Sequence, residues 1–114
     1  MINMDLNFLQ NNVARKADYM VTCLEIGLEL NIDFILFQEP YVSNSSTISH
    51  PAYITILPEN CLRPRVAIFQ LKTSKFNFEL SYTSGDLLII NILIKYITSI
   101  YFNRLVLKII TWIQ

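Results

Sequence analysis

The sequence predicts an α/β (α+β) protein built around β-sheet, and three observations lead to this prediction. An apolar segment, an amphipathic helical segment and a second apolar segment follow one another between residues 6 and 37. Several short segments rich in β-branched and aromatic residues come next, as expected for strands. The 114-residue chain is 53% hydrophobic and only 16% charged. This composition excludes a disordered protein, and the length allows one small domain.

The first three elements predict a βαβ unit. Residues 6–10 have the composition of a short strand, which Asn11 and Asn12 are expected to end. Over residues 15–30, apolar side chains recur at helical spacing and acidic side chains fall outside that stripe, which predicts an amphipathic helix. The apolar stripe consists of Ala17, Met20, Val21, Leu24 and Leu28. Residues 34–37 form a continuous apolar run of the length of a buried strand. A strand, a helix and a strand in this order predict two parallel strands joined by a crossover.

The rest of the chain predicts a loop and four further strands. Residues 43–47 are rich in Ser, Asn and Thr, which predicts a surface loop. Strands are predicted over residues 53–57, 65–71, 76–82 and 87–94, because turn-forming residues separate these apolar runs.

The charges of the chain cancel, but they are unevenly distributed. The net charge is zero, which excludes a generally basic protein that coats nucleic acid. Acidic residues are in excess over residues 1–62, and basic residues are in excess over residues 63–114. An acidic part that faces a basic part could hold a metal ion and a polyanion together.

Cysteine and targeting signals favour an intracellular protein without a membrane span. Cys23 and Cys61 have neither the spacing of a zinc site nor that of a disulfide framework, so both are predicted to be buried free thiols. The first residues lack the pattern of a signal peptide. The apolar stretch over residues 87–113 is interrupted by charged residues, and its uncharged runs fall short of the ~20 residues that a spanning helix requires.

Polar residues follow the first two predicted strands and define a candidate site. Asn11 and Asn12 follow the first strand, and Glu39 follows the second. The carboxyl ends of parallel strands lie at one edge of a sheet, where sites commonly form. A carboxylate directly after an apolar strand needs a compensating ligand or partner. A Mg²⁺ ion would suit this position, because it takes carboxylate oxygens and keeps waters for substrate phosphates.

The same residues also carry a resemblance to a known family. The segments Leu9-Gln10-Asn11-Asn12-Val13 and Ile32-Asp33-Phe34-Ile35-Leu36-Phe37-Gln38-Glu39-Pro40-Tyr41 stand on either side of the predicted helix. Together they resemble the start of the endonuclease/exonuclease/phosphatase superfamily. The similarity is greatest to the apurinic-type endonuclease domain of non-LTR (LINE-like) retrotransposons, especially fungal ones. It covers about residues 6–94.

The resemblance implies a fold, an activity and site residues. The fold would be the N-terminal half of a four-layer α/β sandwich. The activity would be Mg²⁺-dependent nicking of target DNA by the endonuclease of a reverse transcriptase polyprotein, with a possible role in the nucleus. Asn12 would be the active-site amide, and Glu39 would be a catalytic residue and the Mg²⁺ ligand. Asn11 leaves an ambiguity between the two asparagines, because the family often has an aromatic or apolar residue there.

The sequence also departs from the family. Complete domains contain a Gly-Asp-x-Asn motif and a late Ser-Asp-His motif, and this sequence has neither. We therefore expect residues 6–94 to be a partial, inactive domain and residues 95–114 to be a divergent apolar tail. The uncovered half of a sandwich would expose apolar surface and favour self-association. The alternative is a non-enzymatic binding or interaction protein derived from a retroelement.

Three further residues have simpler interpretations. His50, the only histidine, is expected to be an ordinary exposed loop residue. Arg63 and Arg65 flank Pro64, and each could face a phosphate, lie solvated at a strand edge or pair with the acidic part of the chain.

Overall fold

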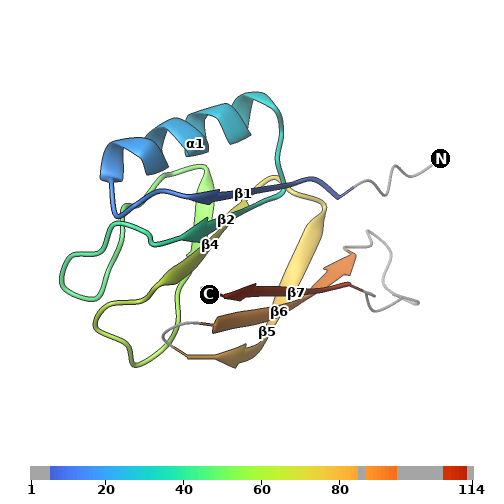
Figure 1. Cartoon of the computed structure of the whole chain (residues 1–114). Coiled ribbons are helices and arrows are strands. Elements are labelled where there is room, and N and C mark those ends of the chain that lie inside the picture. Colours follow the sequence, from blue (N-terminus) through green and yellow to red (C-terminus); the bar gives the residue numbers. More distant parts are fainter. Residues whose placement is uncertain (1–5, 85–86, 95–106, 113–114) are drawn as a thin grey trace.

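The computed structural model describes residues 6–84, 87–94 and 107–112, which form one helix and two β-sheets (Figure 1). The α+β prediction is confirmed. The elements in chain order are β1 (Phe8–Asn12), α1 (Ala17–Glu29), β2 (Phe34–Gln38), β3 (Tyr53–Ile56), β4 (Val66–Leu71), β5 (Phe76–Thr83), β6 (Leu87–Ile94) and β7 (Leu107–Trp112).

The first sheet contains four strands in the order β1-β2-β4-β3. The β1 and β2 strands are parallel, so the βαβ prediction is confirmed, while β4 is antiparallel to both of its neighbours. The central strands β2 and β4 bury almost every side chain, as expected for strands that are covered on both faces.

The second sheet contains β5, β6 and β7 in that order, and all its pairs are antiparallel. The last strand was not predicted: it lies within residues 95–114, where a divergent tail was expected, and pairs with β6. Residues 95–106 and 113–114 of that tail lie outside the described residues. Residues 107–112 therefore belong to the second sheet.

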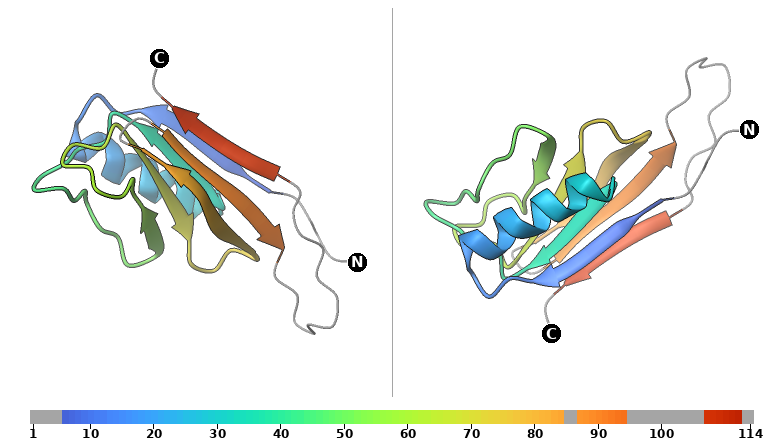
Figure 2. Two further views of the ribbon diagram at one scale, coloured as in Figure 1. Left: turned by 90° about the horizontal axis from the view of Figure 1, so that it is seen from below. Right: turned by 90° about the horizontal axis from the view of Figure 1, so that it is seen from above.

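The helix and the two sheets form three layers, with the first sheet in the middle (Figures 1 and 2). One apolar core lies between α1 and the first sheet and includes Met20, Leu24, Ile35, Phe37 and Phe69. A second core lies between the two sheets and is formed mainly by Phe34, Leu36, Ile68, Leu88 and Ile90. The alternating side chains of β2 contribute to both cores, which explains why its sequence is continuously apolar.

The first strand differs from its prediction at both ends. It spans Phe8–Asn12, whereas residues 6–10 were predicted and the two asparagines were expected to end it. Asn11 and Asn12 continue the parallel ladder opposite Phe37 and Gln38. The asparagines are accommodated because β1 is an edge strand, and most of its side chains are exposed.

The buried face of the helix α1 (Ala17–Glu29) differs from the predicted apolar stripe. Its buried residues are Met20, Cys23, Leu24 and Gly27, whereas the predicted stripe included Val21 and Leu28. These two apolar residues are exposed. No helix in the part of the chain that the structure describes is long and apolar enough to cross a membrane.

Candidate functional site

The structure places Asn12 and Glu39 at the same edge of the first sheet. Asn12 is the last residue of β1 and lies opposite Gln38, the last residue of β2, so Glu39 follows at the same level. The ladder continues past the strands, because the Val13 N–H donates to the Gln38 carbonyl at 3.1 Å. We call this the β1/β2 edge.

The two asparagines have different partners. The Asn12 side chain is exposed, and its Oδ1 accepts a hydrogen bond from the Ala14 N–H at 3.0 Å. This local bond shapes the turn between β1 and α1. The Asn11 side chain donates to Cys23 Sγ on the helix at 3.0 Å. Consecutive strand residues point to opposite faces of a sheet, so Asn11 faces α1 and Asn12 points to the other face.

The backbone of Glu39 has an unusual conformation. Its φ angle is +50°, in the left-handed region that residues other than glycine rarely adopt. It also precedes Pro40, and a following proline normally favours extended backbone. Two hydrogen bonds hold the residue in place: its N–H donates to the Arg65 carbonyl at 2.9 Å, and its carbonyl accepts from the Arg15 N–H at 2.7 Å.

The same two arginines bind the Glu39 carboxylate. Arg15 Nη2 lies 2.8 Å from Glu39 Oε2, and Arg65 Nη2 lies 3.1 Å from Glu39 Oε1. Each arginine therefore contacts Glu39 through both its backbone and its side chain. One carboxylate and two guanidinium groups leave a formal charge of +1 on this cluster. We call it the Arg15–Glu39–Arg65 cluster.

The two guanidinium groups differ in their exposure to solvent. Arg15 Nη1 also donates to the carbonyls of Pro40 and Pro64, at 3.3 and 3.2 Å. Its side chain is 31% exposed, whereas that of Arg65 is 44% exposed. Arg15 thus links the turn after β1 to the segments that follow β2 and precede β4.

The sequence predicts this cluster only in part. It predicted Glu39 at the sheet edge and offered an ion pair with the acidic part of the chain as one interpretation of Arg65, and the structure shows that pair. The sequence predicts Arg15 only as the first residue of the helical segment over residues 15–30. Arg15 lies three residues after Asn12, in the turn that meets the end of β2, and this position is the sequence signal that could have indicated its contact with Glu39.

The arrangement does not fit a bound Mg²⁺ ion. Glu39 and Asn12 supply oxygen atoms of the type that Mg²⁺ prefers. Both Glu39 oxygens, however, contact guanidinium groups, and Asn12 Oδ1 accepts a backbone hydrogen bond. Two positive groups would face the cation. Among the residues that the structure describes, no three His, Cys, Asp or Glu side chains form a group that could hold a metal.

His50 lies elsewhere and is less exposed than predicted. Its side chain is only 16% exposed, and its Nε2 lies 3.0 Å from Glu25 Oε1 on α1. Its Nδ1 accepts from the Ala52 N–H, and its ring packs edge-on against Tyr53. The loop that contains His50 folds back against the helix, which explains the difference. His50 therefore ties this loop to the helix.

Tyr53 completes this contact between the loop and the helix. Its hydroxyl donates to the Leu24 carbonyl at 2.8 Å within the first core. Burial raises the pKa of the Tyr53 hydroxyl above its usual value of 10.0, and the negative charge of Glu25 raises that pKa further.

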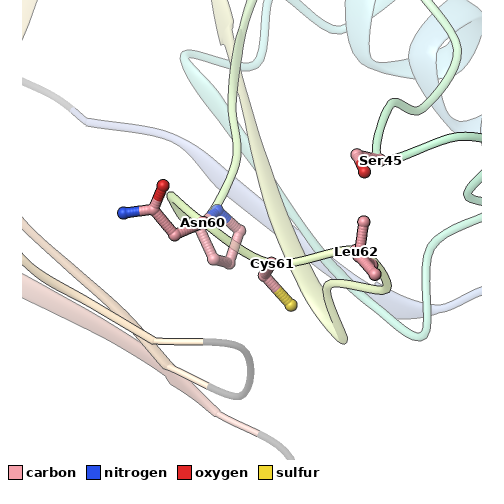
Figure 3. Close-up of a pocket in the computed structure, with 5 residues that line it drawn as sticks. Ser45, Asn60, Cys61 and Leu62 are labelled. Atoms are coloured by element: carbon pink, nitrogen blue, oxygen red, sulfur yellow. The ribbon is translucent and has the colours of Figure 1, made fainter.

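Neither cysteine forms a disulfide, as predicted, but only one is buried. Cys23 lies in the first core, whereas Cys61 is partly exposed. Cys61 lines an open pocket of about 450 Å³ together with Ser45, Pro58, Asn60 and Leu62 (Figure 3). Because these five residues carry no charged side chain, the pocket offers no ion pair to a phosphate group.

Comparisons with known proteins do not assign the chain to a class. No protein family, curated protein or solved structure matches it. The function is therefore argued from the β1/β2 edge itself.

Proposed function

We propose that this chain is the N-terminal part of a Mg²⁺-dependent DNA endonuclease (phosphodiesterase) domain, of the kind that belongs to retrotransposon reverse transcriptases. We further propose that it does not cleave DNA by itself. The observation that carries this proposal is Glu39, held in a left-handed backbone conformation at the carboxyl end of β2, beside the end of β1 where Asn12 lies. Strained residues of this kind often mark functional sites.

The charges at this edge support DNA as the partner. The Arg15–Glu39–Arg65 cluster carries one more positive than negative charge, and both arginine side chains are partly exposed. A guanidinium group matches the geometry of a phosphate group and can donate two hydrogen bonds to it. A phosphodiester backbone could therefore bind at the end of the first sheet.

Two features support an inactive chain. The Gly-Asp-x-Asn and Ser-Asp-His motifs of the resembling domains are missing from this sequence, so it lacks the general base and half of the expected metal ligands. In addition, both carboxylate oxygens of Glu39 already contact arginines. The residues of this chain can position a phosphate and hold Glu39 in place, but they supply no group that activates water.

A plasmid-nicking assay tests the proposed lack of activity. Supercoiled DNA is incubated with Mg²⁺ and either the wild-type protein or Glu39→Gln, and the open-circular product is measured. We expect no product above the buffer control with either protein. Nicking by the wild type that Glu39→Gln abolishes would contradict the proposal, because it would show a complete active site.

The nucleotide sequence tests the proposed family more directly. We expect the DNA that follows the codon for Gln114 to encode Gly-Asp-x-Asn and Ser-Asp-His in one of its reading frames. A long downstream sequence without these motifs in any frame would contradict the endonuclease proposal.

One observation favours the alternative of a non-enzymatic interaction protein. Five large apolar residues of the α1 region are exposed on the two flanks of its buried stripe: Tyr19, Ile26 and Leu30 on one flank, and Val21 and Leu28 on the other. Exposed apolar surface of this kind is typical of protein contacts. The second candidate function is therefore self-association through α1, with a second copy of the chain as the partner.

Light scattering after size-exclusion chromatography tests the second candidate. If α1 mediates self-association, the wild type elutes as a dimer and Ile26→Lys elutes as a monomer. Thr22→Lys is the matched control, because it adds the same charge at an exposed polar position of the same helix. A monomeric wild type at the highest soluble concentration would rule out this alternative.

A further inference from the structure

We propose that the start of α1 and the residue after Pro40 form a surface on which unpaired bases of single-stranded DNA stack. Tyr41 and Tyr19 supply the aromatic rings, and Arg15 and Lys16 supply positive charge between them. This surface selects a single strand over a duplex, because paired bases expose only their edges. The inference rests on the proposed function and deepens it, because it names the form of DNA that binds at the β1/β2 edge.

Tyr41 is exposed, but its backbone is firmly held. The residue is 38% exposed. Its N–H donates to Met20 Sδ at 3.2 Å, and its carbonyl accepts from the Thr47 hydroxyl at 2.6 Å. Met20 is fully buried in the first core, so this anchor is itself fixed. An aromatic side chain on a fixed backbone loses little conformational freedom when a base stacks on it.

Each of the two exposed tyrosines has a cation beside it. Arg15 Nη1 donates at 3.3 Å to the carbonyl of Pro40, the residue that precedes Tyr41. Lys16 Nζ lies 4.8 Å from the centre of the Tyr19 ring, and Tyr19 is 48% exposed. Arg15 and Lys16 are neighbours in the chain, so they connect the two tyrosines. Aromatic rings combined with cations are typical of surfaces that bind single strands.

Met20 places both tyrosines at the same end of the helix. Tyr19 directly precedes Met20 on α1, and the Tyr41 N–H bonds to the Met20 sulfur. The turn before α1 and the segment after β2 meet here, because the Arg15 N–H donates to the Glu39 carbonyl at 2.7 Å (Figure 1). A short extended strand of DNA that crosses this end of α1 can therefore contact both tyrosines.

The charges indicate that stacking provides most of the affinity. Glu39 and Asp18 offset much of the positive charge of Arg15, Lys16 and Arg65. The phosphate backbone is therefore attracted only weakly. A base that stacks on an aromatic side chain, in contrast, raises the affinity roughly 5- to 150-fold. Among the residues that the structure describes, no carboxylate forms an ion pair with Lys16, so its ammonium group can contact a phosphate.

Fluorescence anisotropy tests the stacking. A short labelled single-stranded oligodeoxynucleotide and a duplex of equal length are each titrated with protein in the presence of EDTA. We expect the wild type to bind the single strand more tightly. Tyr41→Ala and Tyr19→Ala should each weaken this binding roughly fivefold or more, whereas Tyr41→Phe should retain it because the ring remains. Tyr82→Ala is the matched control, because Tyr82 is an exposed tyrosine on β5 in the other sheet.

Salt dependence tests the phosphate contact of Lys16. Lys16→Gln should bind the single strand more weakly, and the slope of log affinity against log salt concentration should become shallower by about 0.7. Lys72→Gln is the control for the loss of one exposed lysine, because Lys72 follows β4 and lies outside this surface. An equal slope in the wild type and Lys16→Gln would overturn this contact.

Photocrosslinking tests the stacking on the wild-type protein and does not depend on how the variants fold. An oligodeoxynucleotide that contains 5-iodouracil is bound and irradiated, and the modified peptides are identified by mass spectrometry. We expect the modification at Tyr41 or Tyr19, because this base reacts with aromatic rings on which it stacks. Modification only at other residues would overturn the inference. Circular dichroism shows whether each variant used for anisotropy is folded.

The outcomes separate this inference from the proposed function. Equal affinity for single strand and duplex, unchanged in the tyrosine variants, would overturn the stacking surface and keep DNA as the partner. Absence of binding to either form of DNA would overturn both the surface and DNA as the partner. A downstream nucleotide sequence without the endonuclease motifs would overturn the proposed function, whereas tyrosine-dependent binding of the single strand would still support the surface.

Discussion

At the scale of single residues, the Arg15–Glu39–Arg65 cluster combines an unfavourable backbone conformation with favourable charge contacts. A non-glycine residue in the left-handed region costs on the order of 1 kcal/mol or more. Four contacts offset this cost, because each arginine binds Glu39 once through its backbone and once through its guanidinium group. The left-handed conformation of Glu39 therefore persists because four separate contacts with the two arginines hold this residue in place.

Glu39→Gln tests this balance. The variant keeps the shape of the side chain and the strained backbone but removes the charge. We expect the free energy of unfolding to fall by about 1 kcal/mol, because the ion pairs are partly exposed and solvent weakens them. Urea denaturation followed by circular dichroism measures this change. Glu29→Gln is the control, and an equal loss in both variants would contradict a specific role of the cluster.

Tyr53 gives a prediction about pH. Burial, and to a smaller extent Glu25, raises the pKa of its hydroxyl, so the folded protein holds this proton more tightly than the unfolded chain does. Its contribution to stability is therefore complete below the unfolded value of 10.0, and it declines as the pH rises through the higher folded pKa.

Comparison with Tyr53→Phe isolates this effect from other groups that titrate in the same range. At pH 7 we expect the variant to be less stable by about 1 kcal/mol, because the hydrogen bond to the Leu24 carbonyl is lost. Urea denaturation at increasing pH should show this difference shrinking above pH 10. A constant difference across the alkaline range would contradict the raised pKa.

At the scale of elements, the close contact between α1 and the first sheet depends on Gly27. A Cβ atom at this position would lie 2.5 Å from Ile35 Cδ1 and 3.0 Å from the Tyr53 hydroxyl oxygen. Both neighbours are buried in the first core, so neither can move without disturbing its packing. The glycine thus allows the helix to approach β2 and β3.

Gly27→Ala tests how much the close contact between α1 and the first sheet contributes to the stability of the protein. Alanine favours a helix by about 1 kcal/mol relative to glycine, whereas crowding in a packed core costs about 1–3 kcal/mol. The clash involves two buried side chains, so we expect a net loss of stability in urea denaturation. Thr22→Ala, at an exposed position of the same helix, should not destabilise the protein. A stabilised Gly27→Ala variant would contradict the tight packing of α1.

An element can be predicted from sequence when neighbouring residues determine it, and it is harder to predict when contacts with distant residues determine it. The helix, β2 and the parallel βαβ unit follow from hydrophobic periodicity and from the crossover rule. The end of β1 was misjudged, because asparagine usually ends a strand, and pairing with β2 overrides this tendency. The contact between Arg15 and Glu39 depends on the left-handed turn at Ala14 and Arg15, which no local pattern of non-glycine residues predicts.

At the scale of the whole molecule, the two sheets are joined mainly by the second core. Residues from β2, β3, β4, β5 and β6 form it, and they belong to both sheets. The sequence predicted the strands of this core but not their division between two sheets. Strand composition alone does not determine which strands pair, and β7 was not expected at all.

Ile90→Ala tests whether the two sheets fold as one unit. Ile90 is fully buried on β6, so its truncation leaves a cavity between the sheets. We expect a loss of about 2–4 kcal/mol and a single unfolding transition in urea. Ile54→Ala, at a 43% exposed position of the edge strand β3, should cost clearly less. A separate transition for the second sheet would contradict a shared core.

The central proposal is that this chain is an incomplete endonuclease domain in which Arg15 and Arg65 contact both oxygens of the Glu39 carboxylate. The most direct test is the plasmid-nicking assay with Mg²⁺, in which the wild type is compared with Glu39→Gln. We predict no open-circular product above the buffer control with either protein. Nicking by the wild type that Glu39→Gln abolishes would contradict the proposal.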